Sequence, residues 1–120
     1  MSRTMFERYG GFASVSRVVM SFYDKILSSP LVGPYFADTD MKRLVDHQTK
    51  FVATLMGGPA SYTNEHLERV HVDLGISEAA FSETMELMRE TLEDHDFEGR
   101  DVDQVADEMM ARKNFIVSRK

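Results

Sequence analysis

The stretch 41-MKRLVDHQTKFVATLMGG-58 has the residue spacing of a helix that buries one face and ends at a glycine pair. Four residues at i, i+3, i+4 and i+7 share that face: Leu44, His47, Gln48 and Phe51. An inward face is normally apolar, yet a histidine and a glutamine stand next to each other in the middle of this one. The stretch therefore predicts a helix that presents an imidazole and an amide to the interior of the protein.

Helical spacing also precedes this stretch, and glycine and proline mark where the segments end. After Gly10-Gly11, one helix is predicted from an apolar stripe that comprises Val15, Val19, Phe22, Tyr23, Ile26 and Leu27. Pro30 ends this helix, because proline cannot continue it. Residues 30–40 contain two prolines and one glycine and are expected to form a turn-rich connection.

Three further apolar stripes predict helices in the second half of the chain. The first ends at Gly75 and comprises Leu67, Val70, His71 and Leu74. Ser77 is a suitable N-cap for the second, which comprises Phe81, Met85, Met88 and Leu92. The third follows Gly99 and comprises Val102, Val105, Ala106, Met109 and Met110. With no stretch that alternates like a β-strand, the sequence predicts an all-α fold with globin-like, steeply crossed helices rather than a regular bundle.

Length and composition narrow the class of protein. A chain of 120 residues, 42% hydrophobic and 28% charged, is expected to form one globular domain over residues 1–120. No segment approaches the roughly 18 apolar residues of a membrane span, so no membrane partner is expected. The net charge of −6 argues against a nucleic-acid partner. The absence of cysteine favours a cytoplasmic location and excludes thiolate metal sites and thioether-linked haem.

Two of the predicted helices carry a histidine, His47 or His71, within an apolar face. A single histidine of this kind is most often a core residue satisfied by hydrogen bonds. Two such histidines, with aromatic side chains available to line a cavity (Phe22, Tyr23, Tyr35 and Phe36), instead suit a flat apolar cofactor with a central metal. Haem iron commonly takes a histidine as axial ligand. By contrast, the chain has no H-E-x-x-H zinc motif, phosphate-binding loop or G-x-S-x-G nucleophile motif.

In order and spacing, a series of short motifs between Phe6 and Leu92 resembles the truncated (two-over-two) haemoglobins of the first group. These motifs are F-x-x-Y-G-G, V-V-x-x-F-Y-x-x-I-L, F-A-D-T-D-M, H-Q-x-x-F, G-G-P-x-x-Y-T and V-H-x-x-L-G-I. The resemblance implies two antiparallel helix pairs around a b-type haem. The segment after Leu92 matches this family poorly beyond being helical.

The resemblance also implies roles for individual residues. His71 matches the proximal iron ligand, and Phe36 the phenylalanine that packs on the haem face. Tyr23 and Gln48 match the distal tyrosine and amide that hydrogen-bond bound dioxygen. Leu44 matches a distal position where it contributes bulk, and Phe51 and Val52 match positions along an apolar tunnel to the haem. Tyr62 matches a tyrosine near a propionate. The possible charge partners of the propionates are Arg43, Lys50 or Arg69.

His47 stands where many members of this group have lysine or arginine. Three interpretations remain open: a sixth ligand to the iron, a propionate partner at the pocket mouth, or a solvated surface residue. The inward face shared with Leu44 and Gln48 favours the first, which gives a bis-histidine iron with His71. His66 and His95 are expected on the surface.

The function expected from the resemblance is binding of dioxygen, nitric oxide and carbon monoxide at the haem. Nitric oxide dioxygenation by a monomer, with electrons from a separate unidentified reductase, is the favoured chemistry. A bis-histidine electron-transfer or gas-sensing protein is the alternative from another class. A helical interaction domain without a cofactor is the third.

Overall fold

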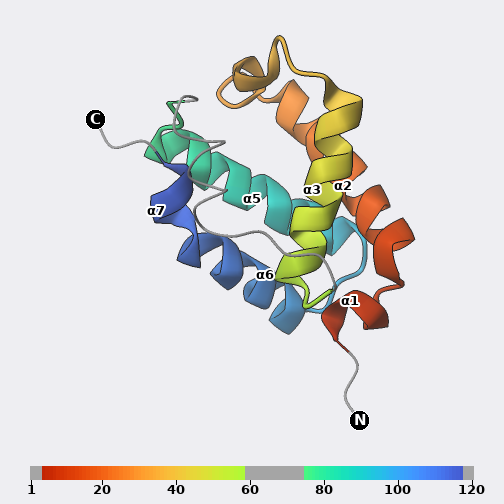
Figure 1. Ribbon diagram of the computed structural model, residues 1–120. Helices are drawn as coiled ribbons and strands as arrows, with labels where there is room; N and C mark the ends of the chain where they lie inside the picture. The colour runs from red at the N-terminus through yellow and green to blue at the C-terminus, as the bar shows by residue number, and fades with distance from the viewer. Residues whose placement is uncertain (1–3, 59–74, 118–120) are drawn as a thin grey trace.

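The computed structural model describes residues 4–58 and 75–117, and all of their regular structure is helical (Figure 1). The elements in chain order are α1 (Met5–Arg8), α2 (Gly11–Ser28), the short 3-10 helix η1 (Gly33–Phe36), α3 (Met41–Leu55), α5 (Glu78–Asp94), α6 (Gly99–Ala111) and α7 (Lys113–Ile116). No strand occurs in these ranges, which confirms the all-α prediction. None of these helices is long and apolar enough to cross a membrane.

Helices α2 and α3 form one pair and run in opposite directions (Figure 1). The predicted stripe of α2 is buried, and the core residues of this helix are Val15, Val18, Val19, Phe22, Tyr23 and Ile26. Leu27, which was expected in the same stripe, is instead 48% exposed. It follows Ile26 by 100° around the helix and so lies beyond the edge of the buried face.

The turn-rich connection contains η1, and a glycine allows this short helix to lie against the end of α2. A Cβ atom on Gly33 would come within 3.0 Å of the Leu27 carbonyl oxygen and 3.2 Å of the Ile26 carbonyl oxygen. The Gly33 amide donates to the Ser29 carbonyl at 2.9 Å. This close approach keeps η1, with its two aromatic residues, next to the buried face of α2.

Helix α3 begins at the N-cap Asp40, whose carboxylate accepts a hydrogen bond from the Arg43 amide at 3.2 Å. It ends before Gly57, which has φ +81, a left-handed conformation that favours glycine. The glycine pair at the end of the opening stretch is therefore a true helix stop. The buried residues of α3 are Thr49, Phe51, Val52, Ala53 and Leu55.

Helices α5 and α6 form the second pair, also antiparallel, which crosses the first (Figure 1). Ser77 is the N-cap of α5, as predicted, and its hydroxyl accepts from the Ala80 amide at 3.1 Å. All four residues of the predicted α5 stripe are buried. In α6 the stripe is buried except for Met110, which is 52% exposed. The core therefore lies between the two helix pairs.

A polar cluster joins the N-terminal end of the chain to the start of α6. We call Arg8, Tyr9, Phe97 and Asp101 the Asp101 cluster. Arg8 donates from Nη1 and Nη2 to the two Asp101 carboxylate oxygens at 3.0 and 2.9 Å, and the Tyr9 hydroxyl donates to Oδ2 at 2.6 Å. The Tyr9 ring stacks on Phe97 with 3.8 Å between centroids. The hydrogen bonds from Arg8 hold the pKa of Asp101 below its ordinary value of 3.8.

Candidate functional site

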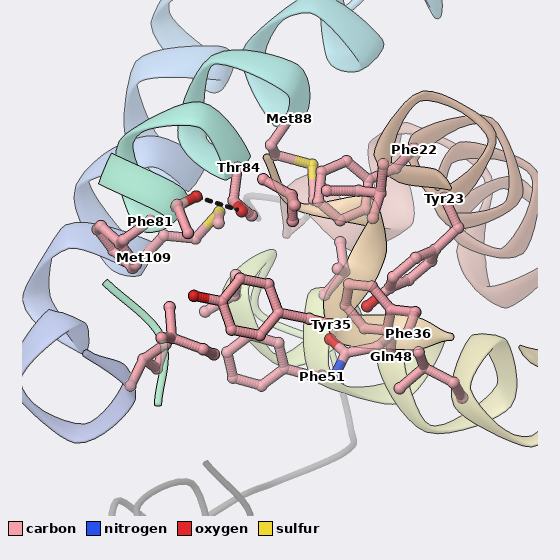
Figure 2. Close-up of a pocket in the computed structure, with 18 residues that line it drawn as sticks. Phe22, Tyr23, Tyr35, Phe36, Gln48, Phe51, Phe81, Thr84, Met88 and Met109 are labelled. Carbon is pink, nitrogen blue, oxygen red and sulfur yellow. Dashed lines mark hydrogen bonds between the residues drawn. The ribbon is translucent and has the colours of Figure 1, made fainter. Parts of the chain in front are cut away.

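A cavity of about 230 Å³ opens between the helix pairs and η1 (Figure 2). Most of the described residues around it are apolar or aromatic. They are Phe22, Tyr23, Ile26, Val32, Tyr35, Phe36, Leu44, Gln48, Phe51, Val52, Leu55, Ile76, Ala80, Phe81, Thr84, Met88, Met109 and Ile116. The few polar side chains in this wall therefore determine which chemistry the cavity can perform.

Tyr23 of α2 brings a phenol to the cavity from a buried position. Its ring meets Phe22 and Phe36 edge to face, with centroid distances of 5.1 and 5.6 Å. The hydroxyl points into the cavity on the side where Gln48 lies (Figure 2). Burial raises the pKa of this phenol far above its ordinary value, so the group stays protonated. Among the described residues nothing accepts its hydrogen bond, which leaves the proton available to a ligand.

Gln48 brings the second polar group to the same side of the cavity. It follows Leu44 by one turn of α3, and both side chains are half-buried. Its amide points toward the region that the Tyr23 hydroxyl also faces (Figure 2). Within the described ranges this amide has no hydrogen-bond partner either. A phenol and an amide thus face one space from two helices.

Among the α5 residues that line the cavity, Thr84 is the polar one, and its hydroxyl is already hydrogen-bonded within the helix. The Thr84 hydroxyl donates to the Ala80 carbonyl at 2.8 Å (Figure 2). Phe81 and Met88 lie on the same side of α5 as Thr84, so this wall is effectively apolar. Phe81 and Met88 were predicted in the apolar stripe of this helix, whereas Thr84 was not predicted. Its i+3 spacing from Phe81 is the signal that could have found it.

Tyr35 of η1 contributes its ring to the wall and directs its hydroxyl to the chain just before α5. The hydroxyl donates to the Gly75 carbonyl at 3.3 Å, and the Ser77 amide donates to the hydroxyl at 3.4 Å. Unlike Tyr23, this phenol is already engaged.

The structure brings together most of the residues that the sequence predicted around a cofactor. The four aromatic residues proposed to line a cavity all do so, as do Leu44, Gln48, Phe51 and Val52. Neither Val32 nor Ile116 was predicted, because each lies outside the longer apolar stripes. These side chains therefore lie in the cavity wall, and their roles there stay predictions.

His47 differs from its expected placement. Its side chain is exposed and is not among the residues that line the cavity. The lining residues Leu44, Gln48 and Val52 recur at i+4, which centres the buried stripe of α3 away from His47. The inward face predicted for α3 therefore does not extend to His47. Ligation of iron by His47 stays a prediction.

Other predicted residues lie beyond the cavity or beyond the described chain. Arg43 and Lys50 are exposed, and the Lys50 ammonium is 3.5 Å from Asp46. His95, expected on the surface, is half-buried and its Nε2 lies 2.9 Å from the Ser21 hydroxyl oxygen. Outside the described residues are Tyr62, His66, Arg69 and His71. Within the described ranges no three His, Asp or Glu side chains gather to hold a metal ion.

Comparison with known proteins settles the family. The sequence model of the bacterial-like globins matches residues 4–117. A group 1 truncated haemoglobin of Tetrahymena thermophila is 31% identical over 91 residues, which cover 76% of this chain and 75% of the relative. The chain belongs to the truncated haemoglobins. This confirms the family predicted from the sequence motifs.

Solved structures of truncated haemoglobins share the fold over nearly the whole chain. The 2/2 haemoglobin of Synechococcus superposes with a TM-score of 0.89 at 26% identity, covering 98% of this chain and 100% of the other. A truncated haemoglobin of Tetrahymena pyriformis gives 0.88 at 24% identity with the same coverage. The family match also extends past Leu92, through residue 117.

Membership in this family implies haem-based gas binding, and the residues around the cavity fit a haem. The Phe36 and Tyr35 rings and the apolar side chains of α3 and α5 offer broad apolar walls to a flat macrocycle. The two polar groups that lack partners in the described chain, on Tyr23 and Gln48, are gathered on one side of these walls. This is where a small polar ligand of a central metal could be recognised.

Proposed function

We propose that this truncated haemoglobin holds a b-type haem in the cavity, with His71 as the proximal iron ligand. When bound, the haem supplies an iron that takes dioxygen, nitric oxide or carbon monoxide. The apolar walls would hold the macrocycle by burial of its surface, and the Phe36 ring is the described aromatic group best suited to pack on its face. The proposal of His71 rests on the motif V-H-x-x-L-G-I.

The observation that carries the proposal is the pairing of Tyr23 and Gln48. Each offers a hydrogen-bond donor that no described residue occupies, inside an otherwise apolar cavity. The Tyr23 phenol and the Gln48 amide would donate hydrogen bonds to a small ligand that carries partial negative charge, as dioxygen would when held by a ferrous haem. Since burial keeps the Tyr23 phenol protonated, it acts as a donor at every physiological pH. The same donors would stabilise carbon monoxide less than dioxygen, because bound carbon monoxide gains less negative charge.

Nitric oxide dioxygenation is the reaction we favour for the loaded protein. A bound ferrous haem would supply the one electron that the conversion of dioxygen and nitric oxide to nitrate takes from the iron, so each turnover would require one electron from a separate reductase. Phe51 and Val52 of α3 are buried from solvent and line the cavity, so they give nitric oxide an apolar path to it. Tyr23 and Gln48 retain dioxygen until nitric oxide arrives. The chain's own residues would therefore retain dioxygen and give nitric oxide access to it.

The alternative is a bis-histidine electron-transfer or gas-sensing protein in which His47 is the sixth ligand. Because His47 is exposed here, its side chain must turn toward the cavity to reach an iron between the helix pairs. An exposed histidine on α3 favours the open gas-binding site over this alternative. If His47 did bind, the affinity for gases would fall by the fraction of open protein.

Absorption spectra of the haem-loaded protein, in its ferric and dithionite-reduced forms, test the proposed gas-binding function and the bis-histidine alternative. We expect wild-type protein to be largely high-spin, His47→Ala to resemble it, and His71→Ala to lose the proximal ligand and release haem. A low-spin wild type that turns high-spin in His47→Ala would establish the bis-histidine alternative. A wild type that takes up no haem would contradict the proposed function altogether.

A further inference from the structure

We propose that Glu83 of α5 is a positioning residue that keeps the Tyr23 phenol directed into the cavity. Its own side chain is not among those that line the cavity. It acts through the Ser29 hydroxyl, which ties η1 to α5, and through Phe36 of η1, which packs on Tyr23. The inference rests on the proposed function, since it takes Tyr23 to be a group that retains a gas ligand.

The hydrogen bond between Ser29 and Glu83 joins the end of α2 to the first half of α5. The Ser29 hydroxyl donates to the Glu83 carboxylate with 2.7 Å between the two oxygens. Ser29 is only 8% exposed and Glu83 is half-buried, so water competes little for this hydroxyl. A hydrogen bond to a charged acceptor in such surroundings is stronger than one between neutral groups.

Ser29 also holds the beginning of η1. Its hydroxyl accepts from the Val32 amide at 3.2 Å, and its carbonyl accepts from the Gly33 amide at 2.9 Å. Gly33 is the first residue of η1, and Val32 lines the cavity. Because the same hydroxyl donates to Glu83, one side chain of α5 fixes the place where the chain leaves α2 and enters η1.

The short helix η1 depends on such attachments because none of its four residues is buried. A single 3-10 turn also has little stability of its own. Toward its other end, the Tyr35 hydroxyl donates to the Gly75 carbonyl at 3.3 Å and accepts from the Ser77 amide at 3.4 Å. These two bonds are long and lie near solvent, so the 2.7 Å bond from Ser29 is the stronger attachment.

The last residue of η1 contacts the phenol proposed to bind the ligand. Phe36 packs edge to face on Tyr23, with 5.6 Å between ring centroids, and both rings line the cavity (Figure 2). Because no described residue accepts a hydrogen bond from the Tyr23 hydroxyl, the direction of the phenol depends on the rings packed against it. Phe22 belongs to the same helix as Tyr23 and moves with it, whereas Phe36 comes from η1. A displaced η1 would therefore release the phenol on one side.

The test compares Ser29→Ala and Glu83→Ala in the haem-loaded protein. Each variant removes one partner of the same hydrogen bond from a different part of the chain, so the test holds if one of them does not fold. Ser28→Ala is the matched control, because Ser28 is exposed and its hydroxyl donates to the Asp24 carbonyl of its own helix at 3.0 Å. Glu83→Gln is the conservative variant, since its amide oxygen can still accept from Ser29.

Three quantities are measured on each variant. Amide exchange in peptides that cover residues 29–37 reports how firmly η1 is held. The C–O stretching band of the carbon monoxide form reports how many orientations the nearby hydrogen-bond donor adopts. The rate of dioxygen dissociation reports how well that donor retains the ligand.

We expect both alanine variants to speed exchange at residues 32–36 about tenfold, the size of a lost hydrogen bond to a charged acceptor. Their C–O band should broaden or split, and dioxygen should dissociate about threefold faster, because the Tyr23 donor is still present but less well directed. Glu83→Gln should fall between wild type and Glu83→Ala, and Ser28→Ala should match wild type. The double variant Ser29→Ala/Glu83→Ala should differ little from either single one, because the two substitutions remove one shared bond.

Faster exchange with an unchanged C–O band and an unchanged dissociation rate would overturn the positioning role, because the bond would then serve the stability of the fold alone. Wild-type exchange in both alanine variants would also overturn it, since η1 would not depend on this bond. Either result leaves the proposed function intact. Failure of the wild type to take up haem would overturn the proposed function, and this inference with it.

Discussion

Tyr9 and Tyr23 occupy two regions of the molecule that treat the same side chain in opposite ways. In the Asp101 cluster the Tyr9 hydroxyl donates to Asp101 at 2.6 Å and accepts from the Glu98 amide at 3.0 Å. In the cavity the Tyr23 hydroxyl has no partner among the described residues. Burial is the main reason why the pKa of each phenol is raised, and Asp101 adds to the effect at Tyr9.

The difference separates a phenol used for stability from one reserved for binding. Tyr9 sits where two distant parts of the chain meet, and its hydrogen-bonding capacity is used within the protein. Tyr23 sits against apolar rings with its hydroxyl open to the cavity, where its hydrogen-bonding capacity is left for a ligand. Substitutions in the two regions should therefore affect different measurements.

The largest expected effect is on stability, from Asp101→Ala. Removal of this carboxylate leaves the Tyr9 hydroxyl and the partly exposed Arg8 guanidinium without their shared acceptor, and should lower the free energy of unfolding by about 2 kcal/mol. Urea denaturation of the haem-loaded protein measures it. Asp103→Ala is the control, because Asp103 is 66% exposed in its pair with Arg89 and should change stability by about 0.5 kcal/mol or less. Equal losses in both variants would contradict the structural role of the cluster.

The next effect is on ligand retention, from Tyr23→Phe. The variant keeps the ring and removes the donor, so dioxygen should dissociate about tenfold faster or more, the size of a lost hydrogen bond to a charged acceptor. Stopped-flow displacement of dioxygen by carbon monoxide measures the rate. Tyr9→Phe should give the reverse pattern, with an unchanged rate and about 1 kcal/mol less stability. A rate that changes equally in both variants would remove the distinction between the two phenols.

The smallest effect is the pH dependence of stability. Hydrogen bonds from Arg8 lower the folded-state pKa of Asp101 below its ordinary value of 3.8. The folded state therefore binds fewer protons than the unfolded state in this range, and stability from Asp101 is present above about pH 4 and lost as the pH falls through the lower folded-state value. Urea denaturation between pH 6 and pH 3 should show a steeper decline for wild type than for Asp101→Asn. Parallel curves would place the acid-sensitive group elsewhere.

The helices and much of the cavity wall were predictable because their signals are local. Helix α3 has an N-cap, an apolar period and a glycine stop within one short stretch of sequence, and the same holds for the Ser77 cap of α5. Tyr23 and Gln48 were assigned through the order of family motifs. Their orientation toward one space required the structure, because it depends on how α2 and α3 pair.

Other features could not be predicted from local signals. Arg8 and Asp101 are 93 residues apart, and no local sequence pattern around either residue predicts its contact with the other. The 3-10 helix η1 depends on the close approach of Gly33 to the end of α2, a tertiary contact. His47 lies at the margin of the buried face, where helical periodicity alone does not distinguish pocket from surface.

The two rings that flank Tyr23 have a consequence for the entropy of ligand capture. With the Phe22 and Phe36 rings both packed against it, the phenol has few side-chain rotamers open to it before any ligand arrives. A donor that is already ordered loses little conformational freedom when it forms its hydrogen bond. More of the enthalpy of that bond is then retained as affinity, which a single phenol on a loosely packed helix could not achieve.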